Sequence, residues 1–211
     1  MPIYLLSDKF IDFPPPVLAE DNGFLAIGGD LSVERLKLAY SQGIFPWYSE
    51  GDPIQWWCPK ERYIIRPGNI HVSHSMKKFM KKHKIETVFN RDFAHTMHKC
   101  RMKRENETWI TDDMEAAYGR LHKAGIAMSV ESVIDGNIAG GLYGVISGKV
   151  FCGESMYTDI ENGSKLALIG LAHYLEKQGF VAIDCQFHTD HLESMGGESV
   201  SYEEYMALLR A

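Results

Sequence analysis

The sequence lacks the long apolar stretch that a membrane-spanning helix requires, since no run approaches about 20 residues. Its first residues, Met1-Pro2-Ile3-Tyr4, lack the basic and then apolar segments of a secretory signal peptide. Cysteine is scarce, and no two cysteines form a Cys-x-x-Cys pair. Without a secretion signal, we expect reduced and mostly buried thiols at all of them: Cys58, Cys100, Cys152 and Cys185. The sequence therefore predicts a cytoplasmic protein that does not contact a membrane.

Motifs of several large protein classes are also missing. There is no Gly-x-Ser-x-Gly elbow and no Rossmann glycine fingerprint, which disfavours serine hydrolases and dinucleotide enzymes. Partial metal-ligand spacing occurs at His188-Thr189-Asp190-His191 and at His95-x-x-His98-x-Cys100, but neither matches a recognised zinc pattern. Nine histidines in a chain of this length produce such pairs by chance. We therefore predict no metal site.

Charge is distributed unevenly along the chain. The formal net charge is −6, yet residues 60–104 carry 13 of the 22 lysines and arginines and only 3 of the 28 acidic residues. This block has a net charge of +10, and the remainder has −16. A local basic block in an acidic protein indicates a directed contact with a polyanion, and a solvated surface without a partner is the alternative.

We expect a small N-terminal unit over residues 1–60 and a second unit over residues 61–211. Near the boundary, Trp47, Trp56 and Trp57 lie in proline-interrupted segments that are too irregular for a helix. Aromatic residues in such segments either pack at a seam between domains or form a platform for a planar ligand. We assign most of the cluster to the seam and leave one tryptophan for a ligand.

In the second unit, helical and extended patterns follow one another. Strands are expected at 63–65, 85–89 and 127–133, a β-hairpin with its turn at Ser147-Gly148, and helices at 73–84, 92–102, 111–125 and 164–178. Ser201-x-x-Glu204 predicts a capping box for the last helix. The helix at 73–84 shows one broad basic face, which suits contact with a phosphate backbone: Lys77, Lys78, Lys81 and Lys82.

Polar side chains interrupt two apolar strands near their ends. In the hairpin arm, alternation predicts that Glu154 shares a face with Val150, Cys152 and Met156. In a strand expected at 181–187, Asp184 and Gln186 would share a face roughly 7 Å apart. Two carboxylates and an amide at neighbouring strand ends suit a reaction site, and a structural hydrogen-bond network explains them equally well.

A series of short motifs resembles, in order and spacing, the leucyl/phenylalanyl-tRNA–protein transferase family. The resemblance runs from about Phe13 to about Gly196. It rests on Gly28-Gly29-Asp30-Leu31, Gly43-Ile44-Phe45-Pro46-Trp47-Tyr48, Trp56-Trp57-Cys58-Pro59, Thr108-Trp109-Ile110, Gly140-Gly141-Leu142-Tyr143-Gly144-Val145, Gly153-Glu154-Ser155-Met156, Ser164-Lys165-Leu166-Ala167-Leu168 and Asp184-Cys185-Gln186. The chain departs from the family pattern at Cys58, Met128, Val133 and Gly197.

The resemblance implies an α+β protein, with a small N-terminal domain and a C-terminal domain that has the mixed sheet of the GNAT (N-acetyltransferase-like) fold. It also implies transfer of Leu or Phe, and in some members Met, from aminoacyl-tRNA to the α-amino group of proteins with N-terminal Arg or Lys. The products enter the N-degron route to proteolysis. No cofactor is needed, and we expect a monomer.

The resemblance also assigns roles within the site. The residue matching Asp184 is proposed to polarise the one matching Gln186, whose carbonyl oxygen receives the amine proton. Alternatively, Gln186 orients the amine while a water or a ribose hydroxyl relays the proton, and Glu154 holds the ribose or the acceptor ammonium. Trp47 and Trp109 are placed against the 3′ adenosine. An apolar pocket for the amino-acid side chain is expected from Leu142, Met156, Leu168, Leu171, Leu175 and Ile183, whose other role is ordinary core.

Two other functions remain open at this level. An acyl-CoA-dependent N-acyltransferase of the same fold would carry a Gln/Arg-x-x-Gly-x-Gly/Ala loop for the pyrophosphate, which Glu161-Asn162-Gly163-Ser164-Lys165 does not match. A non-catalytic RNA-binding module would use the basic block and exposed aromatic residues.

Overall fold

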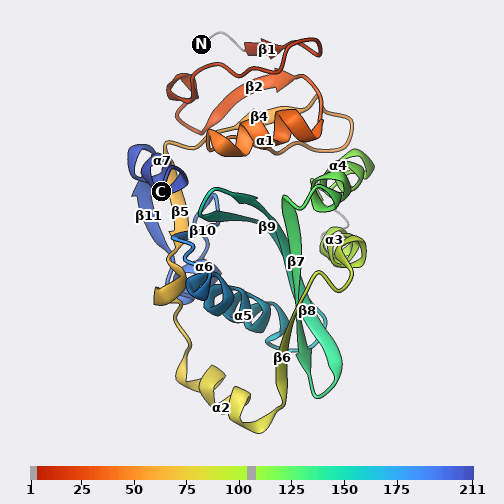
Figure 1. The fold of residues 1–211 in the computed structure, drawn as a ribbon, viewed down its shortest axis with the longest axis vertical. Helices are drawn as coiled ribbons and strands as arrows, with labels where there is room; N and C mark the ends of the chain where they lie inside the picture. Colours follow the sequence, from red (N-terminus) through yellow and green to blue (C-terminus); the bar gives the residue numbers. More distant parts are fainter. Residues whose placement is uncertain (1–3, 104–107) are drawn as a thin grey trace.

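A computed structural model describes residues 4–103 and 108–211, so Arg104, at the end of the basic block, lies outside the described residues. The N-terminal part forms a four-stranded sheet with the order β1-β2-β4-β3, packed beside one helix (Figure 1). Its elements are β1 (Tyr4–Leu6), η1 (Pro16–Leu18), β2 (Phe24–Gly28), α1 (Val33–Ser41), β3 (Phe45–Pro46) and β4 (Gln55–Trp57). Helix α1 begins after Ser32, whose side chain accepts a hydrogen bond from the Arg35 N–H.

The remainder is built on a seven-stranded mixed sheet with the order β11-β5-β10-β9-β8-β7-β6. Its strands are β5 (Glu61–Ile65), β6 (Ile85–Phe89), β7 (Ala127–Ile134), β8 (Asn137–Ser147), β9 (Val150–Thr158), β10 (Ala182–Asp184) and β11 (Glu198–Ser201). Its helices are η2 (Pro67–Asn69), α2 (His74–Lys82), α3 (Phe93–Met102), α4 (Asp112–Lys123), α5 (Gly163–Lys177), α6 (Asp190–Ser194) and α7 (Tyr202–Leu209).

The large sheet separates two hydrophobic cores. Helix α5 covers one face against β7 and β8, while α3 and α4 cover the other face (Figure 1). The core on the α3 and α4 side continues into the N-terminal sheet, so that α1 and β8 are in contact. Strands β9 and β10 pair in parallel and are connected through α5. This arrangement confirms the α+β class and the mixed sheet.

The sheet opens where the parallel pair ends. Strand β10 stops at Asp184, whereas its neighbour β9 continues from Cys152 to Thr158. At the same level the register with β8 shifts between Tyr143 and Gly144, which leaves Glu154 as the extra residue of a β-bulge. The bulge changes the alternation of β9 after Glu154, so the predicted common face is wrong for Met156, which packs against the other core. Val150 and Cys152 lie in the same core as Tyr40 and Tyr118, the partners of Glu154.

Two local predictions at the C-terminal end also need correction. The Ser201 side chain caps α7 by accepting a hydrogen bond from the Glu204 N–H, but the Glu204 carboxylate forms an ion pair with Arg66 and does not complete a capping box. The strand expected at 181–187 is only three residues long, because Gln186 adopts a positive φ of 58°.

Among the described residues, no helix has the length and apolar character to span a membrane.

The close contact between α5 and β8 generates a stability prediction. A Cβ atom added at Gly163 would lie 2.0 Å from the Ala139 carbonyl oxygen, so Gly163→Ala must push the helix away from the strand. We expect this overpacking to lower the free energy of unfolding by about 1–3 kcal/mol in urea denaturation. Gly119→Ala is the matched control. It lies inside α4 with open space around it, and it should raise stability by roughly 0.5–1 kcal/mol. A neutral Gly163→Ala variant would contradict the tight packing.

Candidate functional site

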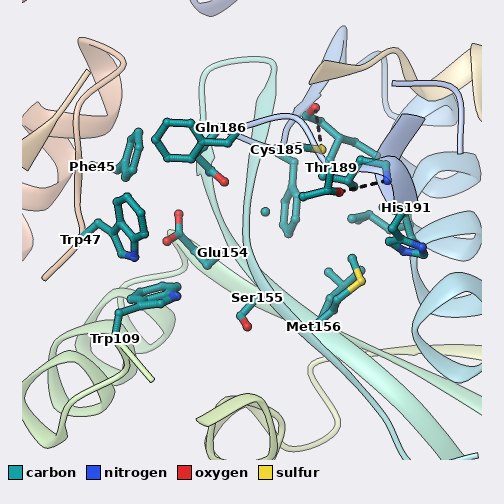
Figure 2. A pocket seen from close by; sticks show the side chains of 18 of the residues that line it. Phe45, Trp47, Trp109, Glu154, Ser155, Met156, Cys185, Gln186, Thr189 and His191 are labelled. Atoms are coloured by element: carbon teal, nitrogen blue, oxygen red, sulfur yellow. Dashed lines mark hydrogen bonds between the residues drawn. The ribbon is translucent and has the colours of Figure 1, made fainter. Parts of the chain in front are cut away.

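A cavity of about 410 Å³ lies at the opening between β9 and β10 (Figure 2). The N-terminal part contributes β3 and the residue after it, and the C-terminal part contributes β8, β9, α5 and the segment from β10 to α6. Most of the lining is apolar or aromatic: Phe45, Pro46, Trp47, Trp109, Leu142, Phe151, Met156, Leu168, Leu171, Ile183, Phe187 and Leu192. The cavity therefore suits a ligand with flat and apolar parts that also reaches a few polar groups.

One end of the cavity is aromatic. Trp47 and Trp109 line it side by side in Figure 2, and the Trp47 side chain is 41% exposed. The Trp47 ring packs edge-on against Trp57 at 5.3 Å and lies 5.5 Å from the Phe187 ring. Both predicted stacking residues thus reach the cavity, and Trp47 also packs at the seam between the two parts of the chain. Trp56, by contrast, is fully buried.

The other end of the cavity is apolar. Five of the six residues expected to surround an amino-acid side chain line it: Leu142, Met156, Leu168, Leu171 and Ile183. Leu175 does not, because it lies one turn further along α5 and is buried in the core beneath the sheet. Helix α5 thus gives one part of its apolar face to the cavity and the next part to the core.

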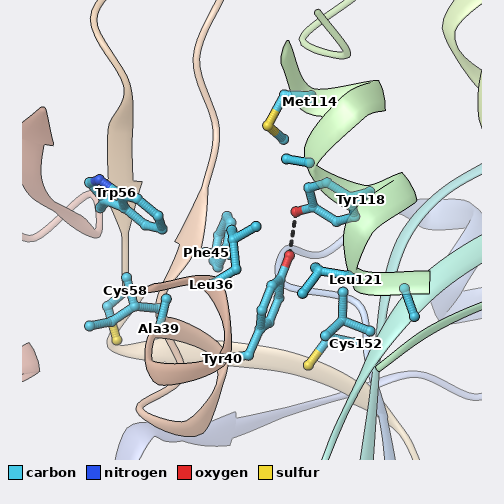
Figure 3. Close-up of a cluster of buried hydrophobic side chains, with 14 of the residues drawn as sticks. Leu36, Ala39, Tyr40, Phe45, Trp56, Cys58, Met114, Tyr118, Leu121 and Cys152 are labelled. Atoms are coloured by element: carbon cyan, nitrogen blue, oxygen red, sulfur yellow. Dashed lines mark hydrogen bonds between the residues drawn. The ribbon is translucent and has the colours of Figure 1, made fainter. Parts of the chain in front are cut away.

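Glu154 of β9 lies on the cavity wall between these ends, and two helices hold its carboxylate. Oε1 accepts a hydrogen bond of 2.7 Å from the Tyr40 hydroxyl of α1, and Oε2 accepts one of 3.2 Å from the Tyr118 hydroxyl of α4. The two hydroxyl groups also bond to each other (Figure 3). Burial raises the pKa of Glu154 to about 7, although the two tyrosine hydrogen bonds act in the opposite direction. This carboxyl group can therefore exchange a proton near neutral pH.

Asp184 does not line the cavity but lies buried beside it. Its carboxylate accepts two hydrogen bonds of 2.8 Å from the Arg62 guanidinium, at Nε and Nη2. The Tyr205 hydroxyl donates to Oδ2 at 2.7 Å, and the backbone N–H of Gln186 donates to Oδ1 at 2.9 Å. Asp184 is thus fully paired, and it acts on the cavity through the backbone of Gln186.

Gln186 lines the cavity from the segment that follows β10. Its side chain points across the cavity toward Glu154 in Figure 2. The positive φ turns the chain out of the sheet, so Asp184 and Gln186 do not share a strand face as expected. The amide Nε2 is buried and has no hydrogen-bond partner in the part of the chain that the structure describes. A buried donor without a partner is costly, so this amide is a candidate to donate to a bound ligand.

Two side chains in the cavity, Cys185 and Ser155, are potential nucleophiles, yet neither is activated. Burial, and secondarily the charge of Asp184, raise the pKa of the Cys185 thiol well above its usual range, so the thiol stays protonated. Ser155 Oγ is buried and finds no hydrogen-bond partner within the described ranges. The geometry of these two side chains therefore does not favour a covalent enzyme intermediate.

The predicted basic face is present but distant from the cavity. Helix α2 begins after Ser73, whose side chain caps it, and lies at the end of the molecule away from the N-terminal sheet (Figure 1). All four lysines on it are exposed, and within the described residues none has a carboxylate within 4.0 Å: Lys77, Lys78, Lys81 and Lys82. Carboxylates of the described residues therefore do not neutralise these four ammonium groups.

One of the two partial metal-ligand spacings brings potential ligands together. His188, Asp190 and Glu193 are close in space, but all three are exposed and lie outside the cavity lining. His188 already pairs with Glu193 at 3.0 Å. These exposed contacts do not reach the cavity.

Sequence reasoning missed four residues that hold the site. Tyr40 and Tyr118 occupy ordinary core positions of two helices, and Arg62 and Tyr205 are far from Asp184 in the sequence. The one available signal is Arg62 itself, an arginine at the start of an apolar strand, which needs a buried partner.

Comparison with known proteins gives a consistent result. Residues 64–210 match the family model described as leucyl/phenylalanyl-tRNA protein transferase, and residues 29–60 match the model of its N-terminal domain. Proteins named leucyl/phenylalanyl-tRNA–protein transferase from Syntrophobacter fumaroxidans and Flavobacterium johnsoniae are each 47% identical to it. Both alignments cover 99% of this chain. They cover 90% of the length of the first relative and 99% of the length of the second.

A solved aminoglycoside acetyltransferase from a soil metagenomic sample superposes with a TM-score of 0.41 at 13% identity, over 54% of this chain and 85% of its own. The match of the family model to most of the chain, together with full-length relatives at this identity, decides the classification. The chain belongs to the leucyl/phenylalanyl-tRNA–protein transferase family.

Proposed function

We propose that this protein transfers Leu or Phe from aminoacyl-tRNA to the α-amino group of proteins with N-terminal Arg or Lys, and so marks them for N-degron proteolysis. Family membership supports the reaction class. The observation that carries the proposal is the cavity, in which aromatic, polar and apolar parts follow one another in the order of an aminoacyl-adenosine. We further propose that residues 1–60 and 61–211 are the two domains and that the protein is cytoplasmic. We also propose that it acts as a monomer, because one chain supplies every part of the cavity.

Each part of the donor has a matching part of the cavity. The 3′ adenosine would stack at the aromatic end on Trp47 and Trp109. The Leu or Phe side chain would fill the apolar end, between α5 and the strands β8 and β9. The ester bond would then lie between these ends, beside Glu154 and Gln186. This placement leaves the reacting carbonyl next to two polar side chains that line the cavity.

Transfer from an ester requires little covalent help from the protein, because the ester is already activated. The protein must position two substrates, provide an uncharged amine and stabilise the tetrahedral intermediate. We propose that the unpaired Gln186 amide donates to the substrate and orients it. Asp184 then serves by fixing the backbone of Gln186, while Arg62 and Tyr205 keep its carboxylate in place.

One assay tests the proposed function against its alternatives. The protein is mixed with labelled Leu-tRNA and a peptide that begins with Arg, and the label on the peptide is measured. We expect transfer, and no transfer to the same peptide with an acetylated N-terminus. Transfer only from an acyl-CoA would identify an acyl-CoA-dependent N-acyltransferase. Binding of tRNA without transfer from either donor would identify an RNA-binding module.

The adenosine position predicts a selective effect of Trp109. Stacking on one base is worth roughly 1–3 kcal/mol, so Trp109→Ala should raise the KM for aminoacyl-tRNA by about ten- to a hundredfold. Trp109→Phe should recover much of the loss, because it keeps an aromatic face. The KM for the peptide should barely change. An unchanged KM for tRNA together with a lower melting temperature would show that Trp109 only packs in the core.

The basic face of α2 predicts a salt effect. We propose that Lys77, Lys78, Lys81 and Lys82 contact the tRNA backbone without reading its bases. Changing Lys77 and Lys81 to Ala should weaken binding of all aminoacyl-tRNAs alike and reduce the slope of log K against log salt by roughly 1–2. Lys37→Ala on α1, at the opposite end of the molecule, is the matched control. An unchanged slope in the double variant would place the tRNA elsewhere.

A further inference from the structure

The Glu154 group has an unusual hydrogen-bond count. Three oxygen–oxygen contacts form a triangle: Tyr40 to Glu154 Oε1, Tyr118 to Glu154 Oε2, and Tyr40 to Tyr118. Each contact needs one proton, and the two hydroxyl groups supply only two. When Glu154 is ionised, both tyrosines donate to it and the contact between them lacks a proton. When Glu154 is protonated, three protons serve three contacts, and each group donates to the next around the triangle.

The triangle is therefore built to accept one proton, and it opens onto the cavity through Glu154 alone. Tyr40 and Tyr118 are buried, whereas Glu154 lines the cavity opposite Gln186. We infer that this triangle, and not the Gln186 amide, takes the proton that the acceptor's α-ammonium group must lose before it attacks the ester. The inference rests on the proposed function and adds a proton acceptor to it. An amide oxygen is a very weak base, so Gln186 alone would leave the amine charged.

The proton balance of the step is complete. The α-ammonium group loses one proton to the Glu154 carboxylate, and the neutral nitrogen attacks the ester carbonyl carbon. A carbon–nitrogen bond forms, and the bond between that carbon and the ribose oxygen breaks. The second proton of the nitrogen ends on the leaving ribose oxygen, and Glu154 later releases its own proton to water. Tyr40 and Tyr118 are positioning residues, because they act on the substrate only through Glu154.

The charged and titratable groups around the triangle come from every element packed against it. They are Tyr40 on α1, Arg62 on β5, Tyr118 on α4, Tyr143 on β8, Cys152 on β9, Asp184 on β10 and Tyr205 on α7. Arg62 and Asp184 neutralise each other. Burial therefore dominates, and it raises the pKa of Glu154 to about 7, where proton exchange with an amine is effective.

Glu154→Gln provides the sharpest variant. Its amide can accept from Tyr40 and donate to Tyr118, so it reproduces the protonated triangle but cannot take up a proton. With labelled Leu-tRNA and an Arg-terminated peptide, we expect kcat at pH 7.5 to fall by about 10²- to 10⁴-fold, while both KM values change by less than about threefold. The wild-type rate should fall below pH about 7, and the variant should instead follow the ionisation of the peptide amine near pH 8.

Tyr40→Phe separates a positioning role from a purely structural one. It removes a hydrogen bond that lowers the pKa of Glu154, so the acid limb of the kcat profile should move to higher pH. Tyr157→Phe is the matched control, since Tyr157 is another buried tyrosine of the same core and does not contact Glu154. Its acid limb should stay in place. An unmoved limb in Tyr40→Phe would contradict the positioning role.

A second measurement needs no tRNA. The folded pKa of Glu154, about 7, is raised above its value of about 4.5 in the unfolded chain. Its stabilising contribution is therefore complete below pH about 4.5 and is lost as the pH rises through about 7. In urea denaturation, the wild type should lose stability relative to Glu154→Gln over this window. A pH-independent difference would overturn the proton-accepting triangle.

The outcomes separate the two proposals. A stability difference that varies with pH, without any transfer by the wild type, contradicts the proposed function and the catalytic part of the inference but leaves the triangle in place. Transfer by the wild type together with a Glu154→Gln variant that retains kcat within about threefold overturns the inference alone. A loss confined to the KM for the peptide also overturns it, because Glu154 would then only bind the ammonium group.

Discussion

The buried ion pair between Arg62 and Asp184 is the interaction on which the site depends. The Arg62 guanidinium also donates to the Gly43 carbonyl oxygen at 2.9 Å and lies over the rings of Phe45 and Tyr205. It thereby joins the N-terminal part, the strands β5 and β10, and the last helix. Removing either charge would leave the other buried and unpaired, at a cost of about 3–5 kcal/mol. Because breaking this ion pair is so unfavourable, it holds the edge of the cavity in one arrangement.

From this pair follows the geometry of the cavity. Asp184 fixes the backbone of Gln186 in its left-handed conformation, which ends β10 and turns the chain away from β9. The bulge at Glu154 bends the partner strand at the same level. The sheet therefore opens between its two parallel strands, with Glu154 on one side of the opening and Gln186 on the other. A regular ladder here would have been filled by core side chains, with no room for a substrate.

The N-terminal part completes the site and is more than an attachment. It supplies Phe45 and Trp47 to the cavity wall and Tyr40 to the Glu154 carboxylate. The core on that side of the large sheet is continuous with the N-terminal core, and this continuity fixes the position of α1. Because three elements converge on a single carboxylate, its protonation is coupled to the packing between the two parts of the chain.

The sequence alone determined what depends on neighbouring residues. Helix starts at Ser73 and Thr111 and the hairpin around Ser147 followed from local capping and turn chemistry, and ordered motifs identified the family. Tertiary structure alone decided which side chains meet. Because of the bulge, Met156 lies on the opposite face of the sheet from Val150. Leu175 lies in the core because it is one turn further along α5 than Leu171. The side chains that bond to Glu154 and Asp184 come from distant segments: Tyr40, Arg62, Tyr118 and Tyr205. Alternation and periodicity hold within one element, whereas buried charges select their partners across the whole fold.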